Sequence, residues 1–288
     1  MRVAIVGLGG VGGYIAANFV RAGIDVVGFA RGTHLEAIRT HGLEIVEDEF
    51  CWSAKIDARE EGELDGYFEG AFDVVIFCVK SYDLADAYKN IASHVDDKTV
   101  LLSFSNGVDN GDTLRRLSKC RVLDGCVYIL SHIEEAGKIR KKGKVFAAIF
   151  GGENEAKDIF VALFEKAQLR YKTPEDIQTA LWKKYLFISA FATLTSYYDK
   201  SIAWVYENHF NEAQELLNEI QVYASKRGID IADEVEKALQ TASKLPADAS
   251  TSMHLDFKKN KPVELDSLTG YVQMPFMQKL YGELKNRL

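Results

Sequence analysis

The sequence predicts an α/β fold in which an N-terminal, Rossmann-type, doubly wound sheet precedes an all-helical C-terminal domain. Three observations support this. Short β-rich apolar runs alternate with helical patterns through residues 1–172, which favours right-handed crossovers and a mainly parallel sheet. The first run ends in a glycine-rich turn. Residues 173–288 show helical spacing and no convincing strand, so we expect two domains, 1–172 and 173–288.

The first half carries its elements in alternation. Strands are expected at 2–7, 25–30, 42–46, 72–79, 99–104 and 121–130, with a hairpin inside 137–152. Helical spacing follows the first strand and recurs at 83–95, 110–118 and 154–166. This order is typical of a dinucleotide-binding sheet.

The second half is predicted to be helical throughout. Helices are expected at 174–198, 206–227, 230–243, 250–259, 263–272 and 276–287. The "TPED" stretch indicates both the domain boundary and a helix start, with Thr173 as N-cap and Pro174 at the first helical position.

Composition excludes several classes of protein. The chain has 288 residues, 47% of them hydrophobic and 27% charged, and its longest nearly apolar stretch, "YLFISAFATL", is too short to cross a bilayer. No signal peptide precedes the first strand, and the four cysteines lack zinc spacing, so we expect a cytoplasmic protein with reduced thiols and no metal. A net charge of -7 argues against general nucleic-acid binding.

The glycine loop is the strongest local motif. "VAIVGLGGVGG" places Gly7, Gly9 and Gly12 in G-x-G-x-x-G spacing between a strand and a helix. Gly7 permits the tight turn, Gly9 lets a pyrophosphate approach the backbone, and Gly12 lets helix and strand pack closely. The pattern predicts dinucleotide binding; a purely structural turn is the alternative.

The end of the second strand indicates which dinucleotide binds. NAD sites usually place Asp or Glu there, whereas this chain has Arg31. A guanidinium pairs with a 2'-phosphate, so the sequence favours NADP(H). In the alternative interpretation Arg31 is a solvated surface residue.

At this point the sequence resembles a known family. "GLGGVGG", "ARGTHLEAIRTHGLEI", "FCVKSYD", "SNGVDN", "LWKK" and "TSMHLDFKKNKPVELDSLTG" are together similar to the ketopantoate reductases (2-dehydropantoate 2-reductases), over nearly the whole chain. The resemblance implies an NADP-dependent oxidoreductase that reduces ketopantoate to pantoate in pantothenate and coenzyme A biosynthesis. It implies an active site between the two domains.

Two polar residues follow predicted strands. Lys80 ends "VVIFCVK" and Asn106 follows "TVLLSF", and ligands bind at the carboxyl ends of strands in such sheets. The resemblance makes Lys80 a cofactor-binding residue and places Asn106 beside both cofactor and substrate. The alternatives are a snorkelling lysine and an Asn-Gly turn.

Adjacent lysines interrupt an otherwise apolar helix. Lys184 shares a stripe with Leu181 and Ile188, while Lys183 lies on the polar side. An inward ammonium suits carbonyl reduction, where negative charge builds on oxygen and an acid must neutralise it. Lys184 also matches the family's catalytic lysine. Snorkelling to solvent is the alternative.

The C-terminal motif supplies further candidates by resemblance. Ser252 matches the residue that hydrogen-bonds substrate oxygen, and Glu264 matches the catalytic-site carboxylate that holds a substrate hydroxyl and tunes the lysine. Asp256 is expected to be structural or to act behind these residues.

Two departures leave alternatives open. Ile188 and Ala192 stand where the family has asparagines that bind substrate and nicotinamide, and the C-terminus looks short. A site without its polar donors loses selectivity. The alternatives are therefore reduction of a different branched 2-oxo acid, or a noncatalytic NADP-binding sensor or regulator. A 6-phosphogluconate-like enzyme is disfavoured because extra basic clusters are missing. Oligomeric state, a homodimer included, stays open.

Overall fold

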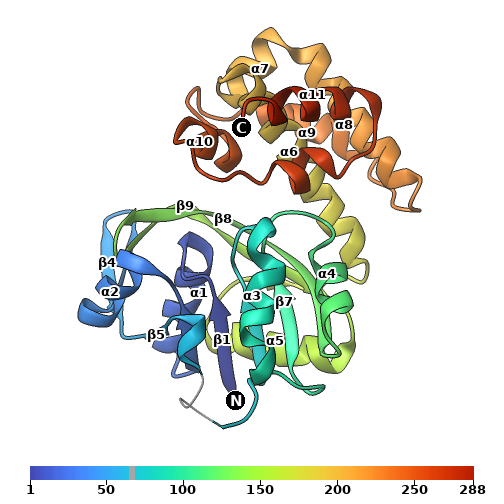
Figure 1. Ribbon diagram of the computed structural model, residues 1–288. Helices are drawn as coiled ribbons and strands as arrows, with labels where there is room; N and C mark the ends of the chain where they lie inside the picture. The colour runs from blue at the N-terminus through green and yellow to red at the C-terminus, as the bar shows by residue number, and fades with distance from the viewer. Residues whose placement is uncertain (65–68) are drawn as a thin grey trace. The chain divides into compact units, whose positions relative to one another are not determined.

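The computed structural model describes residues 1–64 and 69–288 (Figure 1). These residues form two compact units. The first contains Met1–Ser105 and Asp109–Ile177, and the second contains Asn106–Val108 and Gln178–Leu288. The short segment Asn106–Val108 therefore belongs with the C-terminal helices although it follows a strand of the first unit.

A parallel sheet forms the centre of the first unit. Its strands include β1 (Arg2–Val6), β2 (Asp25–Phe29), β6 (Val74–Phe77), β7 (Val100–Ser103) and β5 (Asp57–Arg59). β1 lies between β2 and β6 in parallel register. The sheet continues through β8 (Arg121–Glu135), β9 (Lys138–Gly151), β3 (Leu43–Glu47) and β4 (Phe50–Ala54), so the strand order is β4-β3-β9-β8-β7-β6-β1-β2-β5. The chain moves outward from β1 in both directions, which confirms the doubly wound prediction.

Helices cover both faces of this sheet (Figure 1). The side chains of β1 alternate: Val3 and Ile5 pack with α1 (Gly10–Arg21) and α5 (Asn154–Lys166). The opposite face packs with α3 (Leu84–Ile91) and α4 (Asn110–Leu117). Both faces of β1 are therefore buried, which explains its uninterrupted apolar sequence.

The predicted hairpin inside residues 137–152 is wrong. That segment is one strand, β9 (Lys138–Gly151), paired antiparallel with β8 (Arg121–Glu135). Gly143 has φ +65 but lies at an irregularity, where the pairing moves from Ser131↔Lys141 to Ile129↔Phe146. Gly143 therefore lies within a bulge of the strand and not at a hairpin turn.

Further strands extend the sheet beyond the central parallel part. β3 (Leu43–Glu47) agrees with the predicted strand and pairs with β9, while β4 (Phe50–Ala54), which the sequence did not predict, pairs with β3.

The predicted helix start at Thr173 and Pro174 is also wrong. Tyr171–Lys172 form a short strand, β10, beside β9, and helix α6 spans Ile177–Tyr198. Pairing with β9 keeps Tyr171 and Lys172 extended, and Pro174 disfavours helical geometry at the residue before it, Thr173. The helix starts only after both constraints end.

The second unit is helical among its described elements. They are α6, α7 (Ile202–Asn208), α8 (Phe210–Ser225), α9 (Glu234–Ala242), α10 (Ser252–Lys258), the π-helix η4 (Asp266–Gly270) and α11 (Pro275–Lys285). The helix predicted at 206–227 is interrupted at His209, whose backbone is non-helical (φ -134, ψ 39). Within residues 1–64 and 69–288, no helix combines the length and apolarity that crossing a membrane requires.

Candidate active site

The glycine loop after β1 has the geometry of a dinucleotide cradle. Gly7 has φ +96, which L side chains rarely adopt. A Cβ on Gly12 would lie 2.1 Å from the carbonyl oxygen of Gly7, so helix α1 can approach the turn only with glycine there. A Cβ on Gly9 would meet no atom within 4 Å, so open space faces this residue. Close backbone packing on one side and open space on the other fit a bound pyrophosphate.

Arg31 lies beside this loop. The backbone N–H groups of Gly7 and Leu8 both donate to the carbonyl of Phe29, the last residue of β2, and Arg31 follows two residues later as the N-cap of α2 (Gly32–His41). The guanidinium is 63% exposed and donates to Glu61 Oε2 at 3.0 Å. This hydrogen bond raises the pKa of Arg31. No local pattern in the sequence indicates Glu61, which lies 30 residues away in the chain.

The loops after β6 and β7 are joined to each other. Lys80 follows β6 as the N-cap residue of a short 3-10 helix, Ser81–Asp83. The hydroxyl of Ser105, which follows β7, donates to the carbonyl of Val79 at 2.7 Å. This hydrogen bond connects the loop that contains Lys80 to the loop that leads to Asn106.

Lys184 and Asn106 are in direct contact. Lys184 Nζ donates to Asn106 Oδ1 at 3.0 Å, and both residues belong to the helical unit. The neighbouring Lys183 lies on another face of α6 and forms an ion pair with Glu234 of α9 at 3.1 Å. The two adjacent lysines therefore have different partners, as their positions on the helix predicted.

Glu264 is almost fully buried, at 3% exposure. The segment after it is fixed to α6 by three hydrogen bonds from two side chains: Tyr185 donates to the carbonyls of Ser267 and Leu268, and Ser189 donates to that of Leu268. A hydroxyl pair also joins α6 to η4, because Thr193 Oγ1 and Thr269 Oγ1 lie 2.8 Å apart.

The sequence analysis missed this set of contacts. Its local signal is Ser189 and Thr193, small polar residues one helical turn apart in an otherwise apolar helix.

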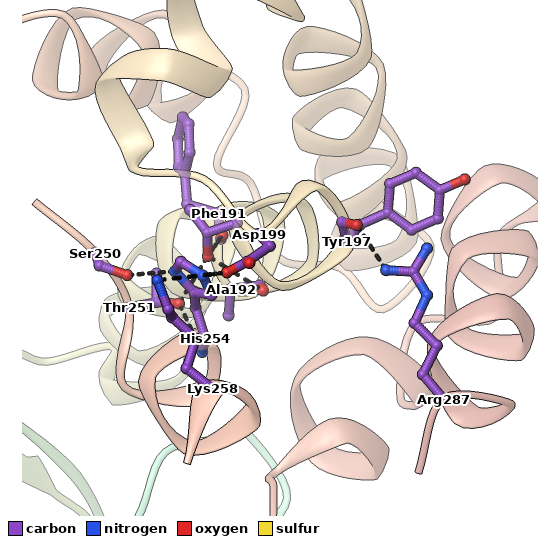
Figure 2. Close-up of polar contacts among 10 residues, drawn as sticks. Phe191, Ala192, Tyr197, Asp199, Ser250, Thr251, His254, Lys258 and Arg287 are labelled. Atoms are coloured by element: carbon purple, nitrogen blue, oxygen red, sulfur yellow. Dashed lines mark hydrogen bonds and ion pairs between the residues drawn. The ribbon is translucent and has the colours of Figure 1, made fainter. Parts of the chain in front are cut away.

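Ser252 is the first residue of helix α10, and the neighbouring residues Ser250, Thr251 and His254 belong to a polar network that includes Asp199 (Figure 2). Thr251 caps the helix by accepting from the backbone N–H of His254, and Thr195 Oγ1 of α6 lies 2.8 Å from Thr251 Oγ1. His254 Nδ1 lies 2.6 Å from Ser250 Oγ, and its Nε2 lies 2.7 Å from Asp199 Oδ1. Asp199 has φ +52, and it follows the C-terminus of α6. These contacts fix the start of α10 against α6.

The two positions that depart from the family pattern, Ile188 and Ala192, carry apolar side chains. Ala192 is 2% exposed and Ile188 is partly exposed, so neither position supplies a polar donor through its side chain. Asp256 helps to end α10, since its carbonyl accepts from the backbone N–H groups of Lys259 and Lys261. Within the described residues, no cluster of three His, Cys, Asp or Glu side chains is arranged to hold a metal ion.

A Rossmann-type sheet with this glycine loop, followed by a helical unit carrying a lysine–amide pair, defines an oxidoreductase that uses a nicotinamide dinucleotide. Family models identify which kind. The model described as "Ketopantoate reductase PanE/ApbA" matches residues 3–152, and "Ketopantoate reductase PanE/ApbA C terminal" matches residues 176–274. The chain belongs to the ketopantoate reductase family.

Individual relatives cover almost the whole chain. An uncharacterized oxidoreductase, YkpB, of Bacillus subtilis is 28% identical, covering 99% of this chain and 98% of its own. A 2-dehydropantoate 2-reductase of Mesorhizobium japonicum is 27% identical, covering 95% and 90%. The crystal structure of a PanE/ApbA family ketopantoate reductase from Ralstonia eutropha is similar with a TM-score of 0.90 at 26% identity, covering 100% and 98%.

Proposed function

We propose that the protein reduces a 2-oxo acid with NADPH, and that the substrate is 2-dehydropantoate, which is converted to pantoate for pantothenate biosynthesis. The observation that carries this proposal is the 3.0 Å hydrogen bond between Lys184 Nζ and Asn106 Oδ1. This hydrogen bond holds the ammonium group of Lys184, the residue that matches the catalytic lysine of the family. Several relatives named 2-dehydropantoate 2-reductase support the choice of substrate.

The chemistry assigned to Lys184 follows from its charge. The nicotinamide, when bound, supplies hydride to the carbonyl carbon of the substrate. Negative charge then develops on the carbonyl oxygen, and an ammonium proton neutralises it. The oxygen of Asn106 accepts one of the three ammonium hydrogens and so limits the orientations of the other two. Asn106 is therefore proposed to orient Lys184.

Substrate binding is assigned to Ser252 and Glu264. Glu264 is 3% exposed, and its carboxylate oxygens can accept a hydrogen bond from a substrate hydroxyl. Ser252 is the first residue of α10. The N-cap of this helix, Thr251, contacts Thr195 of α6, so the backbone that carries the Ser252 hydroxyl is fixed.

The cofactor is assigned to the first unit. Gly7, Gly9 and Gly12 are proposed to hold the pyrophosphate, with Arg31 at the adenosine ribose and Lys80 nearer the nicotinamide.

A second candidate function is the reduction of a different branched 2-oxo acid. The observation that favours it is the apolar pair Ile188 and Ala192, because two amide donors of the family pattern are absent. A site with fewer donors discriminates less strongly between a hydroxylated substrate and an apolar analogue.

An NADPH oxidation assay tests both candidates. Ketopantoate is compared with a panel of branched and unbranched 2-oxo acids, and the proposal expects ketopantoate to have the highest kcat/KM. A higher value for an acid without the hydroxyl would favour the second candidate. No oxidation with any member of the panel would contradict both.

A further inference from the structure

Arg31 and Glu61 occupy equivalent positions after two neighbouring strands. β2 and β5 pair in parallel, and Phe29 is opposite Arg59. Arg31 and Glu61 each follow two residues later, so the sheet brings them to the same edge as the glycine loop. The Nη2 atom of Arg31 donates a hydrogen bond to Glu61 Oε2 at 3.0 Å.

Glu61 is fixed much more firmly than its partner. Its side chain is 9% exposed, whereas that of Arg31 is 63% exposed. The same Oε2 atom also accepts from Asn90 Nδ2 at 2.7 Å, so a residue of α3 holds the carboxylate from a second side. The carboxylate is therefore a fixed charge that solvent screens poorly, while the guanidinium keeps an exposed side for a ligand.

The charge around Arg31 is negative rather than positive. Glu61, Asp83 and Glu60 all act on the guanidinium, with Glu61 the strongest. The nearby His34 does not offset them, because its Nδ1 accepts from the backbone N–H of Gly137 and its Nε2 lies 2.9 Å from the carbonyl of Leu8. That pattern requires the neutral imidazole tautomer.

These charges act oppositely on the two nucleotides. A 2'-phosphate carries a charge of about -1.5 to -2 near neutral pH and is repelled by a fixed carboxylate. A ribose 2'-hydroxyl is uncharged and can donate a hydrogen bond to a carboxylate. The Arg31 guanidinium has the opposite preference, because it binds a 2'-phosphate more strongly than an uncharged 2'-hydroxyl.

We propose that Glu61 is a second determinant of nucleotide choice, which opposes Arg31 by weakening the binding of 2'-phosphorylated nucleotides relative to those with a free 2'-hydroxyl. The inference rests on the proposed nicotinamide site. It makes the preference for NADPH a balance between two side chains from neighbouring strands.

The test compares ligands that differ at the 2' position. NADPH and NADH, and the fragments 2',5'-ADP and 5'-AMP, are titrated against the full chain and the Glu61→Gln variant by calorimetry. Glu63→Gln is the matched control, because Glu63 lies in the same 3-10 turn but pairs with Arg39. Thermal unfolding of each variant verifies folding. Glu61→Gln is expected to raise the affinity ratio of 2'-phosphorylated to unphosphorylated ligand at least about tenfold, and Glu63→Gln less than about twofold.

Each other outcome has a definite meaning. An unchanged or lower ratio in Glu61→Gln, with both nucleotides bound, overturns the inference and leaves the proposed function intact. An equal rise in Glu63→Gln also overturns it, since net charge alone would then explain the effect. If the parent protein binds neither nucleotide, the proposed function fails together with the inference.

Discussion

Lys184 Nζ donates a hydrogen bond to Asn106 Oδ1 at 3.0 Å, although 78 residues separate the two along the chain. The contact exists because Asn106–Val108 belongs to the helical unit while the strand before it belongs to the sheet. A residue at the carboxyl end of a parallel strand thereby reaches a helix that begins at Ile177.

Replacing Lys184 should remove the proton donor. Lys184→Ala is expected to lower kcat by about 10²- to 10⁴-fold and to change NADPH binding little, because the lost interaction forms mainly in the transition state. Steady-state kinetics and NADPH fluorescence titration measure the two effects separately.

Lys183→Ala is the matched control. It breaks the ion pair with Glu234 and should cost at most about 1 kcal/mol of stability, with nearly parental kcat. Near-parental turnover in Lys184→Ala would place the proton donor elsewhere.

Glu264→Gln tests the buried carboxylate while keeping its volume. If Glu264 holds a substrate hydroxyl in both ground and transition states, the variant should mostly raise KM, by about tenfold, with a smaller effect on kcat. A substrate analogue without that hydroxyl should show a much smaller difference between parent and variant. Equal effects on both substrates would contradict the assignment.

Arg31→Ala tests the cation that favours NADPH. The loss of charged hydrogen bonds to the 2'-phosphate should weaken NADPH binding by about 1.5 to 3 kcal/mol per bond, and the Glu61 carboxylate would then act without its partner. NADH binding should change by less than about 1 kcal/mol. Calorimetric titration of both nucleotides measures this; equal losses for the two would show that Arg31 does not contact the 2' position.

The glycine loop offers a matched pair of substitutions. Gly12→Ala places a Cβ 2.1 Å from the carbonyl oxygen of Gly7, so it should lower the melting temperature and abolish nucleotide binding. Gly9→Ala meets no protein atom within 4 Å and should fold normally, yet weaken binding by hindering the pyrophosphate. Differential scanning calorimetry with and without NADPH separates the two outcomes. Normal NADPH affinity in Gly9→Ala would argue against this loop as the pyrophosphate site.

Asp199 gives the helical unit a pH-dependent contact. The hydrogen bond with His254 holds the pKa of this carboxyl below its ordinary value. Stabilisation from a depressed carboxyl pKa is present above the unfolded-state value, about 3.9, and is lost as pH falls through the folded value. The melting-temperature difference between the parent and Asp199→Asn should therefore shrink as pH falls from 7 to below 4.

His254→Leu provides the check on this prediction. In that background the substitution Asp199→Asn should have a smaller pH-dependent effect, because the hydrogen bond that contributes most to the lowered pKa is absent and only the contribution of Lys258 remains. A difference that stays constant with pH in the parent would show that the contact is not electrostatic.

Features that depend on local chain geometry could be predicted from the amino-acid sequence. The G-x-G-x-x-G spacing predicted the turn at Gly7, where positive φ is required, and the helical period separated Lys184 from Lys183. Helix α5 occupies the residues expected for it, Asn154–Lys166. Steric limits and periodicity act between residues a few positions apart, so one sequence is enough to read them.

Contacts between distant segments could not be predicted in this way, because they depend on how the strands pair in the folded chain. Glu61 reaches Arg31 because β5 pairs with β2, and no local pattern around either residue specifies that pairing. Likewise, β9 pairs along its length with β8, so the segment predicted to form a hairpin is one strand with a bulge at Gly143. Strand order and register are determined by the burial of the whole sheet, which is why a carboxylate beside the cation that indicated NADP became visible only in the folded chain.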